Sequence, residues 1–300
     1  MEFAKTNYKL AVGQFAYFTL FIEVTHRISK TDGIVALIVP KALVSNQNFE
    51  LARKFLMDEL GLLTYVDTQM PFESASVESN IIICQKNFKA RKVNKLIFQN
   101  SEFQSKGIFD IRLSENLPFN IFPLLLNKEE YELVVKIKSV SNKTLGEVTD
   151  IIRGFEFGFN HKSITQNKTT YKVIKGENVN KYTVKHTGYY VDADFNDTKT
   201  YKRKEYFLNT PKLLTRFVSN ELIFAYDIEG YCNTNVVYNV HITEKAINIK
   251  YLLGLLNSKL LNFWFFKVYL NDDKLFPHIQ KNQLESIPLI TSKEEFIQPI

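Results

Sequence analysis

Ile34-Val35-Ala36-Leu37-Ile38-Val39 is an unbroken apolar run, and Pro40 follows it directly. Because no polar residue alternates with the apolar ones, the run predicts a strand buried on both faces of a parallel sheet. Proline lacks a backbone N–H and so ends the strand. Apolar residues at helical spacing precede the run over residues 15–29 and follow it over residues 48–59. The stretch therefore predicts an α/β sheet.

Two further apolar runs, residues 62–66 and 77–84, add strands to this sheet. A parallel sheet needs crossover helices on both faces, and only one helix remains after the first strand. Residues 1–90 therefore predict about half of a doubly wound domain. We expect this half to expose an apolar edge or face of its sheet, because strands of this composition are normally covered by neighbours.

Residues 91–144 are more polar and predict a linker that leads out of the first domain. Asn127 and Glu130 have the spacing of a capping box, which predicts a connecting helix from there to about residue 138. Residues 145–300 predict a second, β-rich α+β domain. Its expected strands are short runs at residues 148–152, 189–191, 212–216, 222–226 and 236–242, and one long helix is expected over residues 249–268.

The composition, 45% hydrophobic and 23% charged over 300 residues, is that of a globular chain long enough for two domains. The apolar run that begins at Phe15 stops at Glu23, so it is too short to span a membrane. Cys84 and Cys232 stand far apart without a Cys-x-x-Cys pattern or a cluster of metal ligands. We therefore expect a cytoplasmic protein without a metal site or a disulfide.

Basic charge is concentrated in one part of the second domain. Residues 160–220 contain twelve Lys and Arg against five Asp and Glu, a local net charge of +7, with tyrosines interleaved. Such a patch is suited to phosphate contacts, and a solvated lysine-rich surface is the equally ordinary alternative. The pattern makes double-stranded DNA a candidate partner.

Several short motifs resemble the adenine-specific DNA methyltransferases of the TaqI and type IIG restriction-modification kind. Ile38-Val39-Pro40 and Phe72 followed by Ser76-Val77-Glu78-Ser79 resemble the second half of their catalytic domain. Arg153-Gly154-Phe155-Glu156-Phe157-Gly158, Leu256-Asn257-Ser258-Lys259-Leu260 and Ile287-Pro288 resemble their carboxyl-terminal specificity domain. The resemblance implies a partial Rossmann-like methyltransferase sheet over residues 1–90 and a DNA target-recognition domain over residues 145–300.

The elements that the family needs for catalysis are absent. A Gly-rich turn lets the backbone approach S-adenosylmethionine, and none of the 11 glycines stands in a Gly-x-Gly arrangement. The family's (Asn/Asp)-Pro-Pro-Tyr loop is missing as well, because none of the 8 prolines are adjacent. We expect no catalytic residues and no cofactor binding in this chain alone, although the resemblance implies S-adenosylmethionine for the complete enzyme.

The resemblance also suggests roles for individual residues. Phe72 occupies the position of an aromatic residue that packs against a flipped adenine, and core packing is the competing interpretation. Arg153, Arg203 and Arg216 are candidates for base edges, because a guanidinium can contact guanine bidentately. The candidates for phosphate contacts are Lys199, Lys202 and Lys204, and Asn160 is a candidate for a groove contact.

Our main hypothesis is DNA sequence recognition within an adenine-specific methyltransferase or type II restriction-modification enzyme. The expected partners are double-stranded DNA and an upstream methyltransferase half, or a second copy bound through the incomplete sheet. One alternative is a specificity subunit of a type I system, which predicts a second recognition domain. Another is an inactive fragment whose first domain serves only as an interaction surface.

Overall fold

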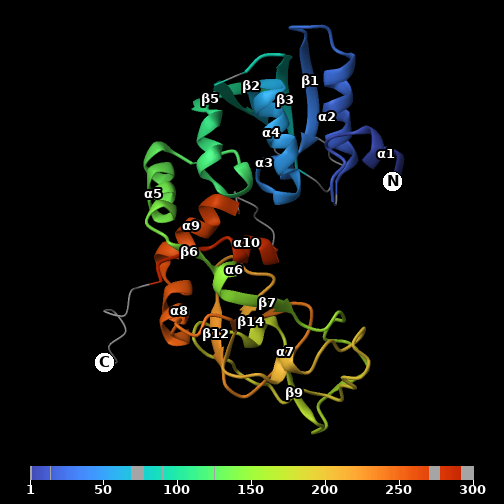
Figure 1. Cartoon of the computed structure of the whole chain (residues 1–300), viewed down its shortest axis with the longest axis vertical. Coiled ribbons are helices and arrows are strands. Elements are labelled where there is room, and N and C mark those ends of the chain that lie inside the picture. The colour runs from blue at the N-terminus through green and yellow to red at the C-terminus, as the bar shows by residue number, and fades with distance from the viewer. Residues whose placement is uncertain are drawn as a thin grey trace. The chain divides into compact units, whose positions relative to one another are not determined.

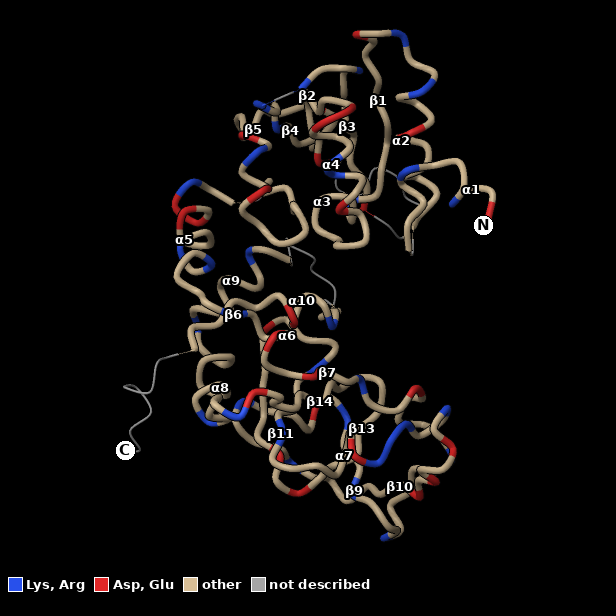
Figure 2. The backbone as a smooth tube through the Cα atoms, in the orientation of Figure 1, with Lys and Arg blue, Asp and Glu red and all other residues tan. Residues whose placement is uncertain are grey.

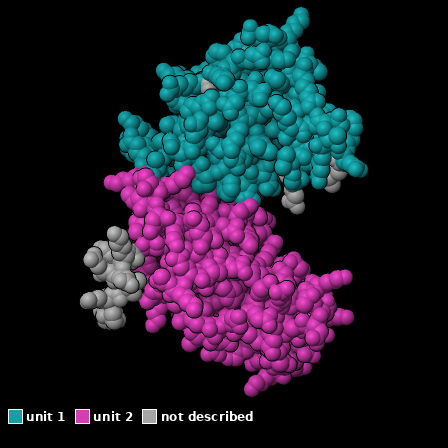
Figure 3. Space-filling view, in the orientation of Figure 1, with its two compact units in different colours: residues 1–135 teal, residues 136–300 magenta. Residues whose placement is uncertain are grey.

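The computed structural model describes residues 2–13, 15–68, 78–89, 91–124, 126–269 and 278–291. The chain forms two compact units, residues 1–135 and residues 136–300, which are coloured separately in Figure 3. The boundary falls within a helix, about nine residues before the expected start of the second domain at Leu145. The first unit therefore includes most of the segment that was expected to be a linker.

The first unit is a mixed α/β unit (Figure 1). Its helices are α1 (Glu2–Asn7), α2 (Tyr17–Ile28), α3 (Ala42–Ser45), α4 (Glu50–Asp58) and most of α5 (Lys128–Ser139), with single turns η1 (Gln47–Phe49), η2 (Ile111–Asn116) and η3 (Pro118–Asn120). Its strands are β1 (Ile34–Pro40), β2 (Leu60–Asp67), β3 (Ser79–Lys86), β4 (Lys92–Gln99) and β5 (Glu102–Asp110). Each element predicted within residues 15–84 is present, with ends shifted by a few residues.

The five strands form one sheet in the order β1-β3-β2-β4-β5. β3 pairs antiparallel with both β1 and β2, β2 pairs parallel with β4, and β4 pairs antiparallel with β5. The prediction of a parallel sheet around the first strand was therefore wrong. The expected linker was wrong over residues 92–110, because β4 and β5 extend the same sheet. An apolar run with polar flanks, such as residues 93–98, does not by itself show which sheet it joins.

The core of this unit lies on one face of the sheet. Leu37, Ile82 and Tyr65 are cross-strand neighbours on that face, and they pack with Ile22 of α2 and Leu56 of α4. α2, α3 and α4 bring apolar side chains to this face, and none of the core residues of this cluster belongs to the opposite face.

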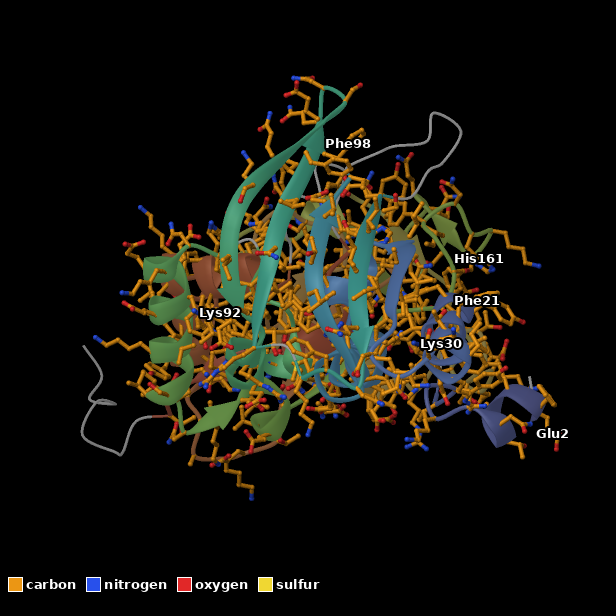
Figure 4. The ribbon with its side chains drawn as sticks, turned by 90° about the horizontal axis from the view of Figure 1, so that it is seen from above. Glu2, Phe21, Lys30, Lys92, Phe98 and His161 are labelled. Carbon is orange, nitrogen blue, oxygen red and sulfur yellow. The ribbon has the colours of Figure 1, made fainter. Side chains whose placement is uncertain are left out.

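The opposite face, which we call the open face, carries exposed apolar side chains. Pairing places Ile34 and Ile38 of β1 on one side of it and Ile108 and Phe103 of β5 on the other, and these four are 62%, 59%, 65% and 61% exposed. Phe103 contacts Phe98, which is labelled in Figure 4, across the hairpin. Their ring centroids are 4.8 Å apart. β1 is therefore buried on one face only, which corrects the prediction that both faces are buried, and the expected exposure of an apolar sheet face is confirmed.

The second unit is rich in short strands. Its strands are β6 (Lys143–Thr144), β7 (Thr149–Arg153), β8 (Ile164–Thr165), β9 (Tyr171–Ile174), β10 (Tyr190–Val191), β11 (Lys212–Arg216), β12 (Phe224–Asp227), β13 (Cys232–Asn233), β14 (Val237–Ile242) and β15 (Pro288–Leu289). Its helices are α6 (Leu145–Val148), α7 (Glu205–Leu208), α8 (Ile249–Leu256), α9 (Lys259–Tyr269) and α10 (Lys281–Glu285), with one turn η4 (Gly176–Asn178). The main sheets have the orders β12-β11-β14-β7 and β13-β9-β10-β8.

The single long helix expected over residues 249–268 is two helices. α8 ends at Leu256 and α9 begins at Lys259. The side chain of Asn257, at the break, accepts from the backbone N–H of Phe224 at 3.0 Å and donates to the carbonyl of Phe224 at 2.9 Å. The hydroxyl of Ser258 then accepts from the N–H of Leu261 at 3.2 Å. The apolar stripe continues through this break, so periodicity alone predicted one helix.

Within the described residues, every helix is too short or too polar to cross a membrane. The same ranges contain no group of three or more His, Cys, Asp or Glu side chains arranged to hold a metal ion.

Candidate nucleic-acid interface

The motif from Arg153 to Gly158 leaves β7 and enters an aromatic cluster. Phe155 is fully buried, and its ring lies 5.0 Å from that of Phe157 and 4.4 Å from that of Phe207. Phe157 in turn stacks on His161 at 4.0 Å (His161 is labelled in Figure 4). The aromatic residues of the motif therefore pack the domain.

Arg153 is held in place at the end of β7. Its Nε donates a hydrogen bond to the carbonyl of Asn235, and its guanidinium carbon lies 3.9 Å from the centroid of the Phe217 ring. Phe217 also stacks on His278, with ring centroids 4.8 Å apart and an angle of 21° between the planes. We call Arg153, Phe217, Asn235 and His278 the Arg153 platform.

Lys202 is engaged within the domain. Its Nζ donates to the carbonyl of Arg153 at 3.0 Å and pairs with Glu156 at 2.6 Å, and its backbone has a φ of 59°. A residue with a side chain adopts this left-handed conformation only where surrounding contacts hold it. Lys202 therefore fastens the loop before α7 to the Arg153–Gly158 motif.

Three other basic candidates are at the surface. Lys199, Arg203 and Lys204 are exposed, and Lys204 lies 5.7 Å from the ring centroid of Tyr171. Asn160 is exposed as well. Arg203 and Lys204 precede α7 directly, where the tube in Figure 2 is blue before the helix begins.

Arg216 lies at the end of β11 and is half-buried. Its Nε donates to the carbonyl of Val179 at 2.8 Å. Burial lowers the pKa of its guanidinium from the ordinary value, and Glu221 and Glu177 oppose this effect. The side chain thus connects β11 to the segment after η4. No hydrogen bond in the described part of the chain joins it to the exposed cations around α7.

The surface of the basic window, residues 160–220, carries less free positive charge than the net charge of the sequence suggests. Lys172 pairs with Glu229, Lys175 with Glu177 and Lys181 with Glu221, at 2.8, 2.6 and 2.6 Å. Lys212 is fully buried against Asp227. Among the described residues, the exposed cations of the window without an ion pair are Lys162, Lys168, Lys185, Lys199, Arg203 and Lys204.

A cavity of about 570 Å³ lies between β7, α7 and β14. Its lining includes the carboxylates of Asp150, Glu205 and Glu244. Burial lowers the pKa of His241, which also lines it, so this imidazole does not offset the negative charge at neutral pH. Lys245 also lines the cavity, and Glu244 pairs with Lys143.

Phe72, the candidate for stacking on a flipped base, lies outside the described residues.

Of the other candidates, the structure brings together Arg153 and Lys202 and leaves Lys199, Arg203 and Lys204 exposed. Phe217, Asn235 and His278 were not predicted as partners of Arg153. These contacts join segments far apart in the chain, and no local pattern indicates them.

Comparison with known proteins agrees with this architecture. Residues 171–289, which contain most of both main sheets, match the family model of the TaqI-like C-terminal specificity domain. A putative type II restriction enzyme and methyltransferase of Methanocaldococcus jannaschii is 26% identical over an alignment 309 positions long, which covers 95% of this chain and 25% of the relative. The chain thus spans about a quarter of the length of that relative.

Two solved structures of restriction-modification enzymes are also similar to the chain. The type IIL enzyme MmeI in complex with DNA has a TM-score of 0.52 at 10% identity, over 90% of this chain and 40% of that one. The type IIG restriction endonuclease BpuSI has a TM-score of 0.40 at 12% identity, over 95% of this chain and 43% of that one. Residues 171–289 are thus similar to the TaqI-like C-terminal specificity domain.

Proposed function

We propose that this chain recognises a DNA sequence as the carboxyl-terminal part of an adenine-specific restriction-modification enzyme. The observation that carries the proposal is the match of residues 171–289 to a specificity domain family. The M. jannaschii relative, whose printed name joins a restriction enzyme to a methyltransferase, supports the setting. With its two buried free thiols, Cys84 and Cys232, the chain suits the reducing cytoplasm.

The exposed cations around α7 are the proposed phosphate contacts. Lys199 and Lys204 have charges that are free to meet a DNA backbone. Arg203 was a candidate for a base edge, and because it is exposed next to Lys204 we now propose it as a phosphate contact. Lys202 is committed to Glu156 and Arg153. Arg153, Arg216 and Asn160 are the proposed contacts to base edges. Phe72 stays proposed as the residue that packs against a flipped base.

Removing the exposed cations tests the phosphate contacts. In the full chain, the triple change Lys199→Ala, Arg203→Ala and Lys204→Ala is expected to weaken binding to every duplex similarly. It should also flatten the dependence of log affinity on log salt by about 0.9 for each phosphate that the variant no longer neutralises, because fewer counterions are released. Fluorescence anisotropy across a salt series measures both quantities.

A matched control removes the same amount of charge from the first unit. Lys5, Lys89 and Lys106 are exposed, and their triple change to Ala should leave the salt slope near that of the parent. If the two triple variants have equal slopes, the cations around α7 do not contact phosphate.

The first unit is proposed to be the later part of a methyltransferase sheet. In the complete enzyme S-adenosylmethionine would supply the methyl group. The residues present here do not fit that cofactor, because Lys41-Ala42 follows β1, Asn87-Phe88 follows β3 and Asn100-Ser101 follows β4. A Gly-rich turn is thus missing at each of these strand ends, so the chain alone should not methylate DNA.

The open face is the proposed contact with the methyltransferase half or, in its absence, with a second copy. Burying one large apolar side chain contributes about 1.5–3 kcal/mol, and the open face exposes four of them. Ile34→Lys is therefore expected to reduce self-association of the full chain, measured by size-exclusion chromatography with light scattering. Ile228→Lys is the control, because Ile228 is also 62% exposed but belongs to the second unit. A monomeric parent chain at micromolar concentration would contradict this use of the face.

A further inference from the structure

The Arg153 platform fixes the orientation of one guanidinium. The hydrogen bond from Nε to Asn235 sets one edge of the group, and the Phe217 ring 3.9 Å away sets its plane. An arginine on a protein surface normally samples many rotamers, and ordering it costs free energy when it binds. In this chain the fold already orders the side chain of Arg153, so this cost is not added on binding.

Phe217 is itself held by the segment of chain that contains His278 and Ile279. The backbone N–H of Ile279 donates to the carbonyl of Phe217 at 2.7 Å, and Val218 forms a backbone bridge with His278. The His278 ring lies almost parallel to the Phe217 ring. The platform under the guanidinium is thus fixed from a second segment of the chain.

The two terminal nitrogens of Arg153 remain available. Among the described residues, neither Nη1 nor Nη2 has a hydrogen-bond partner, and neither is among the buried polar atoms that lack one. They therefore reach solvent as a pair in a fixed plane. The neighbouring ion pair between Lys202 and Glu156 leaves the fork itself free.

A fixed planar fork of two N–H donors matches the O6 and N7 acceptors of guanine in the major groove. A phosphate accepts hydrogen bonds from many directions and gains little from a donor whose plane is fixed, whereas a base edge requires that plane. We infer that Arg153 reads one guanine of the recognised sequence and that Phe217 is its positioning residue. This inference rests on the proposed function and adds the base and the device that reads it.

The test uses the full chain and a library of DNA duplexes with a randomised central segment. Bound duplexes are sequenced for the parent, Arg153→Lys, Phe217→Leu and Phe217→Tyr. Arg153→Lys keeps the charge but not the fork, so preference for guanine at one position is expected to fall about tenfold while other positions keep theirs. Phe217→Leu should weaken the preference for guanine at the same position. Phe217→Tyr keeps the aromatic ring and should keep that preference.

The control is Arg91→Lys, at an arginine of the first unit whose side chain is 80% exposed, and it should leave the whole profile unchanged. Thermal melts check that each variant folds, and if Phe217→Leu does not fold, Arg153→Lys and Phe217→Tyr carry the test. An unchanged profile for Arg153→Lys overturns the inference and leaves the proposed function standing. Equal weakening on all duplexes shows a phosphate contact and also overturns it. A parent without any sequence preference overturns both.

Discussion

Gly154→Ala is expected to destabilise the second unit by about 3 kcal/mol, at the upper end of the cost of overpacking a closed site. A Cβ at this position would lie 2.2 Å from Oδ1 of Asn233, 2.4 Å from its carbonyl oxygen and 2.3 Å from the carbonyl oxygen of Thr234. Two of these atoms are backbone, and Asn233 is also fixed by reciprocal hydrogen bonds with Asn239 at 2.8 and 3.1 Å. The neighbours therefore have little room to yield.

Gly158→Ala is the matched control, because it changes the other glycine of the same motif. A Cβ at Gly158 would meet nothing within 4 Å, and its φ is not in the left-handed region. This variant should melt within a few degrees of the parent, whereas Gly154→Ala should melt about 6–12 °C lower in a unit of this size. Circular dichroism melts of the two variants give the comparison. Equal melting temperatures would show that the contact at Gly154 is loose.

Several elements were predictable from local signals. The strand at residues 34–39 has an unbroken apolar pattern, the strand at residues 212–216 was expected from a short strand-like run, and both are present. The capping box was also predictable, because it is a contact over three residues. The N–H of Glu130 donates to Oδ1 of Asn127 at 2.8 Å, and the N–H of Asn127 donates to Oε2 of Glu130 at 3.1 Å. Such signals depend on the neighbours in sequence and on little else.

Strand direction and sheet membership were not predictable in the same way. The run from Ile34 to Val39 has the composition of a strand that is buried on both faces. Composition does not show which neighbouring elements cover each face. Ile34 and Ile38 are exposed in this chain although their residue type suits burial. The mismatch itself supports a partner on the open face. Residues 92–110 join the sheet through long-range pairing that no local pattern determines.

The candidate site shows the same division. Arg153 was proposed from its residue type and motif, whereas its orientation depends on Phe217, Asn235 and His278, which lie far along the chain. Lys202, which was expected at a phosphate, donates to the carbonyl of Arg153 and pairs with Glu156. A lysine next to two other cations has the same sequence signal in either role, and only the position of Glu156 distinguishes them.

Lys212→Met is expected to have the other large effect, a loss of about 3–5 kcal/mol in the stability of the second unit. Both charged groups of the pair, Lys212 and Asp227, are fully buried. Nζ of Lys212 donates to the carboxylate of Asp227 and to the carbonyl of Phe207. Burial lowers the pKa of Lys212 from its ordinary value, and the attraction of Asp227 opposes that shift. The ammonium is thus retained in the core mainly because of this carboxylate.

Removing the lysine leaves Asp227 buried with only backbone donors. Its carboxylate then has the N–H groups of Glu229, Gly230 and Tyr231, at 2.9, 3.0 and 3.1 Å, and no cation. The melting temperature should fall by about 10 °C, and adding Asp227→Asn should recover part of the loss because the uncompensated charge is gone. Lys172→Met is the control, since Lys172 pairs with Glu229 at a surface where both side chains are about half exposed. It should melt close to the parent. If Lys212→Met also melts with the parent, or if Asp227→Asn makes it worse, the stability of this unit does not depend on neutralising the buried carboxylate.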